Sequence, residues 1–120
     1  MTETRTRVAV IDDDESVRRG LRRLLQAHQW EVHTYASAEE FLDRASSLDA
    51  DIALVDIYLP GLSGIELLKL LEFGGEGPVV ILMTAHGESE TADALRAAGC
   101  TFCLRKPFTL QQLLDAMLAA

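Results

Sequence analysis

The sequence predicts an α/β fold in which one parallel sheet carries helices on both faces. Short apolar runs typical of buried strands alternate with helical patterns five times along 120 residues. No internal repeat or linker interrupts the alternation. Strands that alternate with helices in this way run parallel, and the connecting helices cover both faces of the sheet. We therefore expect a single domain over residues 1–120, with any ligand bound beyond the carboxyl ends of the strands.

The composition is that of a globular domain, with 48% hydrophobic and 25% charged residues. A net charge of −8 offers nucleic acid no broad basic face, so we expect no direct contact with it. A local basic cluster has a helical spacing that favours a solvated helix face: Arg18, Arg19, Arg22 and Arg23. The first seven residues lack the apolar core of a signal peptide, and no stretch is long enough to span a membrane. These observations predict a cytoplasmic protein without membrane contact.

The first strand is predicted at Val8–Ile11, an apolar run that ends at acidic residues. A helix follows, because side chains that suit its inner face recur at spacings of three and four: Val17, Leu21, Leu24, Leu25 and His28. Residues 32–35 form a short strand near an edge of the sheet, since it carries His33 and Thr34. Ser37 and Glu40 form a capping box that opens a helix through about residue 46, with these side chains facing inward: Phe41, Leu42 and Ala45.

The third strand is predicted at Ile52–Val55, buried on both faces and ending at Asp56. Ser63 and Glu66 form a second capping box, and the helix that follows carries Leu67, Leu68, Leu70 and Leu71. Val79–Met83 is the most apolar run of the chain and is predicted to be a central strand.

The last part of the chain predicts two helices around a fifth strand. A helix from about residue 88 to 98 is closed by Gly99, as a left-handed C-cap requires. The strand is predicted at Thr101–Leu104. Thr109 and Gln112 then cap a final helix that carries Leu110, Leu113, Leu114, Met117 and Leu118.

The two cysteines, Cys100 and Cys103, have the C-x-x-C spacing but not its usual setting. In a redox site this motif opens a helix, whereas here it follows Gly99 and lies in or beside a strand. Strand geometry would send the two side chains to opposite faces, and no second ligand pair exists for zinc. We interpret both as reduced packing residues.

Polar residues stand at the ends of four predicted strands: Asp12, Asp13, Asp56, Thr84 and Lys106. Brought together, three carboxylates cannot all stay ionised without compensation. A hard divalent cation suits such a set of oxygens, magnesium before calcium. With the charge of Lys106 and the hydroxyl of Thr84, the set suits phosphoryl transfer to Asp56. The Lys106–Pro107 bond is a candidate cis bond that would fix where Lys106 points.

Each of these residues also has an ordinary explanation. Asp56 could cap a helix, Thr84 could be a strand residue, and Lys106 could be a solvated charge. Taken singly, the ordinary explanation is favoured for all but Asp56. Five such residues at one edge of four strands make coincidence the weaker explanation.

At this point the chain resembles the receiver domain of two-component response regulators. The motifs follow that family's order and spacing along nearly the whole chain: residues 11–15, 55–64, 83–87, 97–99 and 106–108. Residues 84–87 and 37–41 resemble receivers attached to LuxR-type transcriptional outputs. The resemblance implies a flavodoxin-like sheet of strand order 2-1-3-4-5. It implies a signalling domain that catalyses only its own phosphorylation and dephosphorylation.

The resemblance also assigns roles to the residues at the strand ends. Asp56 would accept phosphate from the phosphohistidine of a sensor histidine kinase. Asp13, Asp56 and the backbone carbonyl of Tyr58 would bind Mg²⁺, with Mn²⁺ as an alternative ion, and Asp12 would act mainly through a metal-bound water. Lys106 and Thr84 would contact the phosphoryl oxygens. The helix at 88–98, the strand at 101–104 and the final helix would form the face for a homodimer or an output partner.

The chain departs from the family at Cys103, where receivers usually carry Tyr or Phe. Strand alternation should point the neighbouring Phe102 to the other face, so Phe102 is a poor substitute. Coupling of phosphorylation to the output would then rest on movement of the loop and of Thr84. Tyr58 and His86 border the expected path of the attacking water. They either shield the acyl phosphate or are exposed loop side chains without consequence.

Two other functions compete with a phosphoacceptor. A haloacid-dehalogenase-like phosphatase also uses a strand-end aspartate, and Asp12-x-Asp14-x-Ser16 superficially fits its opening motif. That fold needs a later acidic pair and usually a cap, for which 120 residues leave no room. A degenerate receiver that acts as an unphosphorylated interaction module is the second rival, and the intact set of strand-end residues argues against it.

Overall fold

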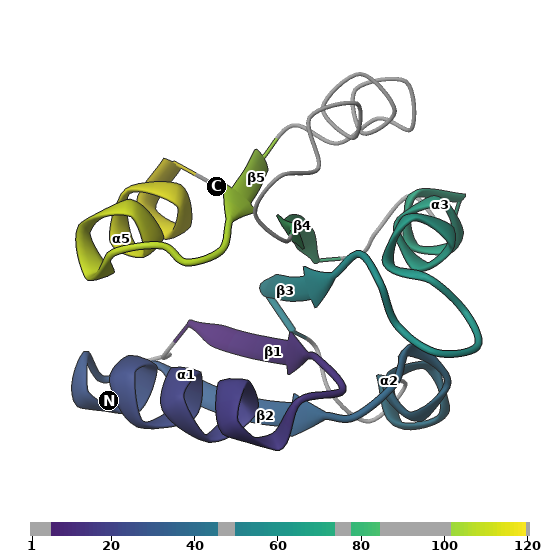
Figure 1. Cartoon of the computed structure of the whole chain (residues 1–120), viewed down its shortest axis with the longest axis horizontal. Helices are drawn as coiled ribbons and strands as arrows, with labels where there is room; N and C mark the ends of the chain where they lie inside the picture. Colours follow the sequence, from purple (N-terminus) through teal and green to yellow (C-terminus); the bar gives the residue numbers. More distant parts are fainter. Residues whose placement is uncertain (1–5, 46–49, 74–77, 85–101, 120) are drawn as a thin grey trace, which may run out of the picture.

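The structure, a computed structural model, describes residues 6–45, 50–73, 78–84 and 102–119. Within these ranges the strands form one parallel sheet of order β2-β1-β3-β4-β5 (Figure 1). The strands are β1 (Arg7–Ile11), β2 (Glu31–Tyr35), β3 (Ile52–Asp56), β4 (Val79–Thr84) and β5 (Phe102–Arg105). The predicted flavodoxin-like order is confirmed, and β2 lies at an edge as its polar residues indicated.

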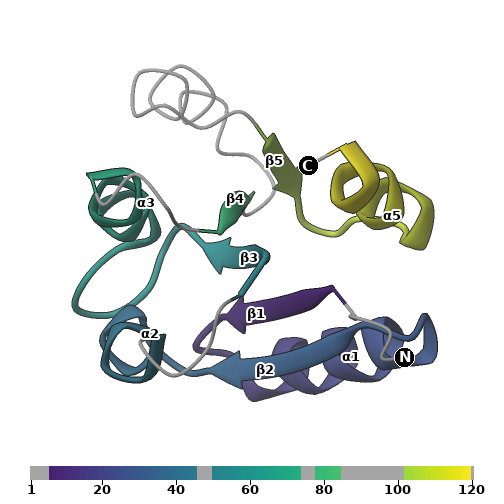
Figure 2. The same ribbon diagram turned by 180° about the vertical axis from the view of Figure 1, so that it is seen from behind.

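The helices of the described residues cover both faces of this sheet, two on each face. They are α1 (Glu15–Ala27), α2 (Ala38–Ala45), α3 (Gly64–Phe73) and α5 (Leu110–Ala119). Figures 1 and 2 show α1 and α5 on one face, with α2 and α3 on the other. The helix predicted at residues 88–98, together with Gly99 and Cys100, lies outside the described residues.

The sheet divides the apolar interior into two cores. Because successive side chains of a strand point to opposite faces, Val10 packs with α1 and α5 whereas Ile11 packs with α2 and α3. Leu54 and Val55 of β3 are divided in the same way. All four side chains are fully buried, and burying each stabilises the fold by about 1.5–3 kcal/mol.

Two of the three predicted capping boxes form reciprocally. Ser63 and Glu66 exchange hydrogen bonds at 2.9 and 3.1 Å, and Thr109 and Gln112 do so at 2.8 and 3.1 Å. At α2 the amide of Glu40 donates to Ser37 Oγ at 3.0 Å. However, Glu40 Oε1 accepts from the amide of Ala36, at 2.7 Å, rather than from that of Ser37.

Leu42 was predicted to face inward, but its side chain is exposed, and other members of the helical patterns also lie at the surface. The following are exposed: His28, Leu42, Leu70, Leu110 and Leu118. A helix laid on a sheet buries one stripe, and apolar residues beside that stripe remain at the surface. His28 caps the end of α1, where its Nδ1 lies 3.0 Å from the carbonyl oxygen of Leu24. None of the described helices is both long and apolar enough to cross a bilayer.

Candidate functional site

The carboxyl ends of the strands bring together the acidic residues that the sequence predicted would meet. Asp12 follows β1, Asp13 is next to it, and Asp56 ends β3. One carboxylate oxygen from each lies within 4.8 Å of the others. Asp12 is fully buried, Asp56 has 13% of its side chain exposed, and Asp13 is open to solvent. The group is therefore an acidic cluster at the rim of the sheet, with Asp13 open to solvent and Asp56 partly exposed.

Asp12 uses every polar atom that it has. Its Oδ1 accepts from the amide of Asp14 at 2.9 Å, and its Oδ2 accepts from Lys106 Nζ at 2.7 Å. Its own amide donates to the carbonyl of Tyr35 at 3.1 Å, and its carbonyl accepts from Arg18 Nη1 at 2.8 Å. A buried carboxylate is tolerated because these partners replace the water that it has lost.

Lys106 brings a positive charge to the acidic cluster. Its Nζ lies 2.7 Å from Asp12 Oδ2 and 3.8 Å from Asp56 Oδ2. Its amide donates to the carbonyl of Thr84 at 2.7 Å, which fixes the end of β5 to the end of β4. The bond between Lys106 and Pro107 is cis, as predicted. The sequence predicted that Lys106 and Asp12 would lie at the same edge of the sheet. It did not predict that they form an ion pair, because the two residues are 94 positions apart.

The carboxyl of Asp56 has a raised pKa. Burial is the main cause of the raised pKa, and the negative charges of Asp12 and Asp13 raise it further. The positive charge of Lys106 and the hydrogen bond from the Tyr58 amide lower the pKa. That amide donates to Asp56 Oδ1 at 3.3 Å. Crowded carboxylate oxygens that disfavour their own ionisation are a donor set that suits a hard divalent cation such as Mg²⁺.

The raised pKa predicts that Asp56→Asn stabilises the metal-free protein. A carboxyl group whose pKa is raised by folding stabilises the folded state at pH values below its unfolded pKa. This contribution is lost as the pH rises through the pKa of the folded state. Ionised Asp56 therefore costs stability at neutral pH, and replacing it with the uncharged amide should raise the free energy of unfolding. Urea unfolding at pH 7 and below about pH 4 measures this, and the gain should vanish in acid. Equal stability of the two proteins at pH 7 would contradict it.

The other predicted site residues have different surroundings. Thr84 is buried at the end of β4, beside the acidic cluster through its contact with Lys106. The Tyr58 side chain is 54% exposed, and Pro107 is exposed as well. His86 lies outside the described residues. Cys103 is exposed on β5 and forms no disulfide in the described part of the chain, so its interpretation as a packing residue is wrong.

The loop from β3 to α3 is held at several points that sequence reasoning did not identify. The amide of Gly64 donates to the carbonyl of Ile57 at 2.9 Å. A Cβ at Gly64 would lie 2.4 Å from the Asp56 carbonyl oxygen, so only glycine fits there. Glu39 of α2 accepts from the amide of Leu62 at 2.8 Å. In the sequence, Gly64 is the one residue that signals this close packing of the loop. The contact from Glu39 leaves no recognisable pattern in the sequence.

Comparison with known proteins agrees with this fold. The family model described as response regulator receiver domain matches residues 8–118. Transcriptional regulatory protein FixJ of Azorhizobium caulinodans is 39% identical over 113 residues, covering 94% of this chain and 54% of that protein. Response regulator MprA of Mycolicibacterium vanbaalenii is 34% identical, covering 94% of this chain and 49% of that protein. The chain thus spans about half the length of the curated relatives it matches.

Solved structures match over nearly the whole chain. A response regulator receiver protein from Burkholderia phymatum superimposes with a TM-score of 0.86 at 37% identity, covering 96% of this chain and 94% of that one. Chemotaxis protein CheY4 of Vibrio cholerae gives a TM-score of 0.88 at 26% identity, covering 97% and 98%. With the family model matched over residues 8–118 and a shared sheet order, the chain belongs to the response regulator receiver domain family.

Proposed function

We propose that this receiver domain takes a phosphoryl group onto Asp56 from the phosphohistidine of a sensor histidine kinase, in a Mg²⁺-dependent reaction. The observation that carries the proposal is the cluster of Asp12, Asp13 and Asp56 oxygens within 4.8 Å of one another. Lys106 stands beside it, 3.8 Å from the acceptor carboxylate. Residues 1–120 would then be one receiver domain that acts only on its own phosphate.

The residues divide the work of the transfer between them. As the P–N bond to the donor imidazole breaks, a P–O bond forms to an Asp56 oxygen, and the imidazole keeps the electron pair. Mg²⁺, held by Asp13, Asp56 and the Tyr58 carbonyl with Asp12 behind them, would neutralise charge on the transferred oxygens. Lys106 Nζ is close enough to Asp56 to donate a hydrogen bond to the transferred phosphoryl oxygens. The Thr84 hydroxyl would be a further donor to these oxygens.

Incubation with Mg²⁺ and acetyl phosphate, followed by intact-protein mass spectrometry, tests this function. We expect a gain of one phosphate that is lost in Asp56→Ala. Asp43→Ala is the matched control, since Asp43 is an exposed acid on α2, and it should keep the gain. A gain that persists in Asp56→Ala, or no gain in the natural sequence, would refute the proposal.

The phosphatase alternative is weakened by the start of α1. Asp14, the second acid of the superficial motif, is the N-cap of this helix, and its Oδ1 accepts from the amide of Ser16 at 2.8 Å. These atoms therefore serve the helix rather than a substrate. Catalytic turnover of p-nitrophenyl phosphate would revive that alternative.

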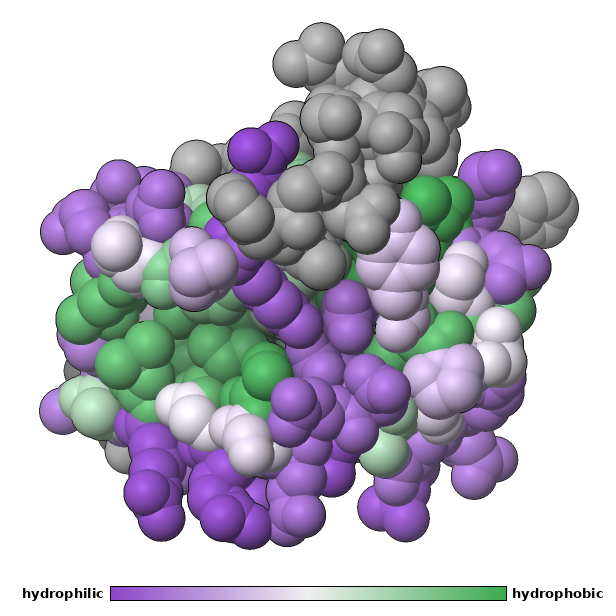
Figure 3. Space-filling view, viewed as in Figure 1, coloured by the Kyte–Doolittle hydropathy of each residue, from purple (hydrophilic) through white to green (hydrophobic). Residues whose placement is uncertain are grey.

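An apolar groove beside Lys106 supports docking of a phosphodonor protein. It runs between α1 and the segment after β5, has a volume of about 600 Å³, and is seen as the green hollow between α1 and α5 in Figure 3. Its apolar lining includes Val17, Leu21, Leu24, Pro107 and Phe108. Because Lys106 lines the same groove, a kinase helix seated there would bring its phosphohistidine to the acidic cluster.

For the output we propose a surface that includes β5 and α5, used for dimerisation or for another partner. Exposed leucines on α5 support it: Leu110 is 41% exposed and Leu118 is 78% exposed. Apolar side chains in such positions suit a contact surface.

Cys103→Tyr is predicted to change the affinity of this output more than the phosphorylation rate. The side chain at 103 is exposed on β5 and belongs to the proposed surface, whereas the acidic cluster is made of Asp12, Asp13 and Asp56. Sedimentation of the phosphorylated protein measures self-association, with Cys103→Ser as the control of similar size. Equal affinities in the Tyr variant and the natural sequence would contradict this.

A further inference from the structure

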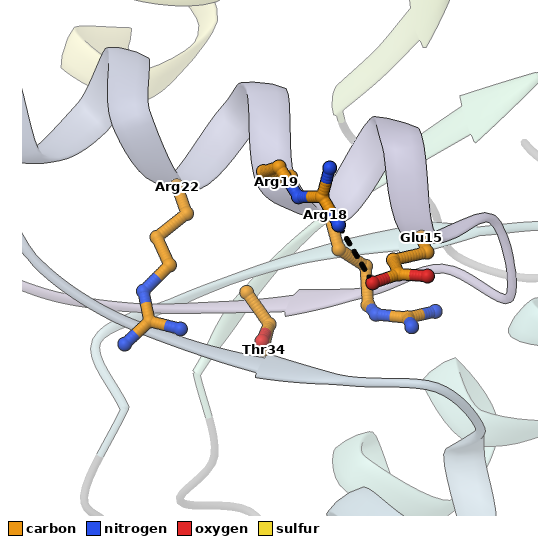
Figure 4. Close-up of a pocket in the computed structure, with 5 residues that line it drawn as sticks. All are labelled: Glu15, Arg18, Arg19, Arg22 and Thr34. Atoms are coloured by element: carbon orange, nitrogen blue, oxygen red, sulfur yellow. Dashed lines mark hydrogen bonds and ion pairs between the residues drawn. The ribbon is translucent and has the colours of Figure 1, made fainter.

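A pocket of about 220 Å³ lies between α1 and the edge strand β2, apart from the acidic cluster. It is lined by Glu15, Arg18, Arg19, Arg22 and Thr34. Figure 4 shows Arg18 and Arg22 reaching from α1 toward β2 on either side of Thr34, while Arg19 stays against the helix beside Glu15. The lining therefore carries three guanidinium groups and one carboxylate in a chain whose net charge is −8.

Helix α1 gathers these charges against its own stability. Arg18 and Arg22 are four positions apart, as are Arg19 and Arg23, and like charges at this spacing destabilise a helix. Only Glu15 offsets them within the helix, through its 2.8 Å ion pair with Arg19. This arrangement goes beyond a solvated helix face, which would normally interleave the two signs of charge.

The guanidinium donors of the pocket are not all used by the protein. Arg18 is half-buried and gives one N–H to the carbonyl of Asp12 at 2.8 Å. Among the described residues, Arg22 takes part in no hydrogen bond or ion pair. Thr34 contributes a half-buried hydroxyl from β2. The pocket therefore offers several N–H donors and a hydroxyl, and its one carboxylate is already paired with Arg19. Such a lining favours the binding of an anion.

We propose that this pocket binds a phosphate dianion, either free or as the head of a small phosphate monoester. Planar guanidinium groups donate two parallel hydrogen bonds to phosphate oxygens, which gives both strength and geometric selectivity. The volume of about 220 Å³ is several times the ~30 Å³ share of one water, so it admits a hydrated tetrahedral anion. It is too small for a helix, which is about 10 Å across with its side chains.

The site is separate from the proposed acceptor, and its test needs neither Mg²⁺ nor a kinase. Without Mg²⁺ the cluster of three carboxylates repels phosphate, so binding there does not confuse the result. Inorganic phosphate is titrated into ¹⁵N-labelled protein at a pH where phosphate is a dianion, and the arginine Nε–H and backbone amide signals are followed. We expect saturable shifts at Arg18, Arg22 and Thr34.

Arg22→Gln and Arg23→Gln form a matched pair for this titration. Both remove one positive charge from α1, but Arg23 does not line the pocket. Because charge-assisted hydrogen bonds are lost, Arg22→Gln should weaken phosphate binding about tenfold, and Arg23→Gln by less than about twofold. Equal weakening in the two variants, or no saturable shift at the pocket residues, would overturn the proposal.

Two further titrations define the ligand. Glycerol 3-phosphate compared with inorganic phosphate shows whether a monoester or the free anion binds more tightly, and either order supports the site. Succinate tests whether carboxylates serve equally well. Succinate binding as tight as that of phosphate would overturn the phosphate assignment, because it would mean that the pocket takes the acidic side chains of a protein partner.

Discussion

Lys106→Met is expected to lower the free energy of unfolding by about 3 kcal/mol at pH 7 in metal-free buffer. Asp12 is the reason, since its side chain is 1% exposed and its Oδ2 receives the Lys106 ammonium at 2.7 Å. Methionine preserves the length of the stem and removes the charge, which leaves Asp12 buried without its cation. Breaking a buried pair in this way costs far more than losing a surface pair.

Urea unfolding of four proteins measures this effect as a double-mutant cycle: the natural sequence, Lys106→Met, Asp12→Asn and the double variant. The double variant should recover much of the loss, because the uncompensated carboxylate is gone. Lys69→Met is the control, since Lys69 is an exposed lysine on α3, and it should change stability by less than about 0.5 kcal/mol. If Lys106→Met costs no more than Lys69→Met, the pair does not stabilise the site.

Gly64→Ala is expected to lower the free energy of unfolding by about 3 kcal/mol and to slow the proposed phosphorylation of Asp56. The added Cβ would lie 2.4 Å from the Asp56 carbonyl oxygen and 2.8 Å from Ile57 Cα. Both neighbours are backbone atoms, so the clash cannot be relieved by rotating a side chain. The loop that follows the proposed acceptor must move, and Asp56 moves with it.

Gly20→Ala provides the matched control for that substitution. Gly20 lies within α1, and a Cβ there would meet no atom within 4 Å. Alanine should therefore stabilise the protein by about 1 kcal/mol, through helix propensity alone. Opposite signs for the two variants in urea unfolding would support the structural account. Gly64→Ala with natural stability and a natural phosphorylation rate would show that the loop tolerates a side chain.

Most of the fold, and the meeting of the candidate site residues at one edge of the sheet, could be predicted from the sequence. Continuous apolar runs such as Ile52–Val55 identify strands that are buried on both faces, and the alternation with helices makes them parallel. Because the carboxyl ends of parallel strands share one edge, Asp12, Asp56 and Lys106 were expected to meet there. That inference used chain order alone.

What the sequence could not provide was the pairing of individual atoms. Lys106 could have approached either Asp12 or Asp56, and only the positions of the strand ends decide that Asp12 is nearer. The contact from Glu39 to Leu62 spans two elements and leaves no pattern. Helical spacing likewise identifies an apolar face but not its width, so Leu42 was predicted to face inward and lies at the surface.

The bonds of Asp12 have a consequence for the sheet as a whole. The amide of this residue holds the end of β2, and its side chain holds Lys106, just beyond β5. These strands are the two opposite edges of the sheet, with β1, β3 and β4 between them. Asp12 thus links the two edges of the sheet through its hydrogen bonds. Amide protons at the two edges should therefore exchange with solvent in a correlated way, and loosening either edge should be felt at the other.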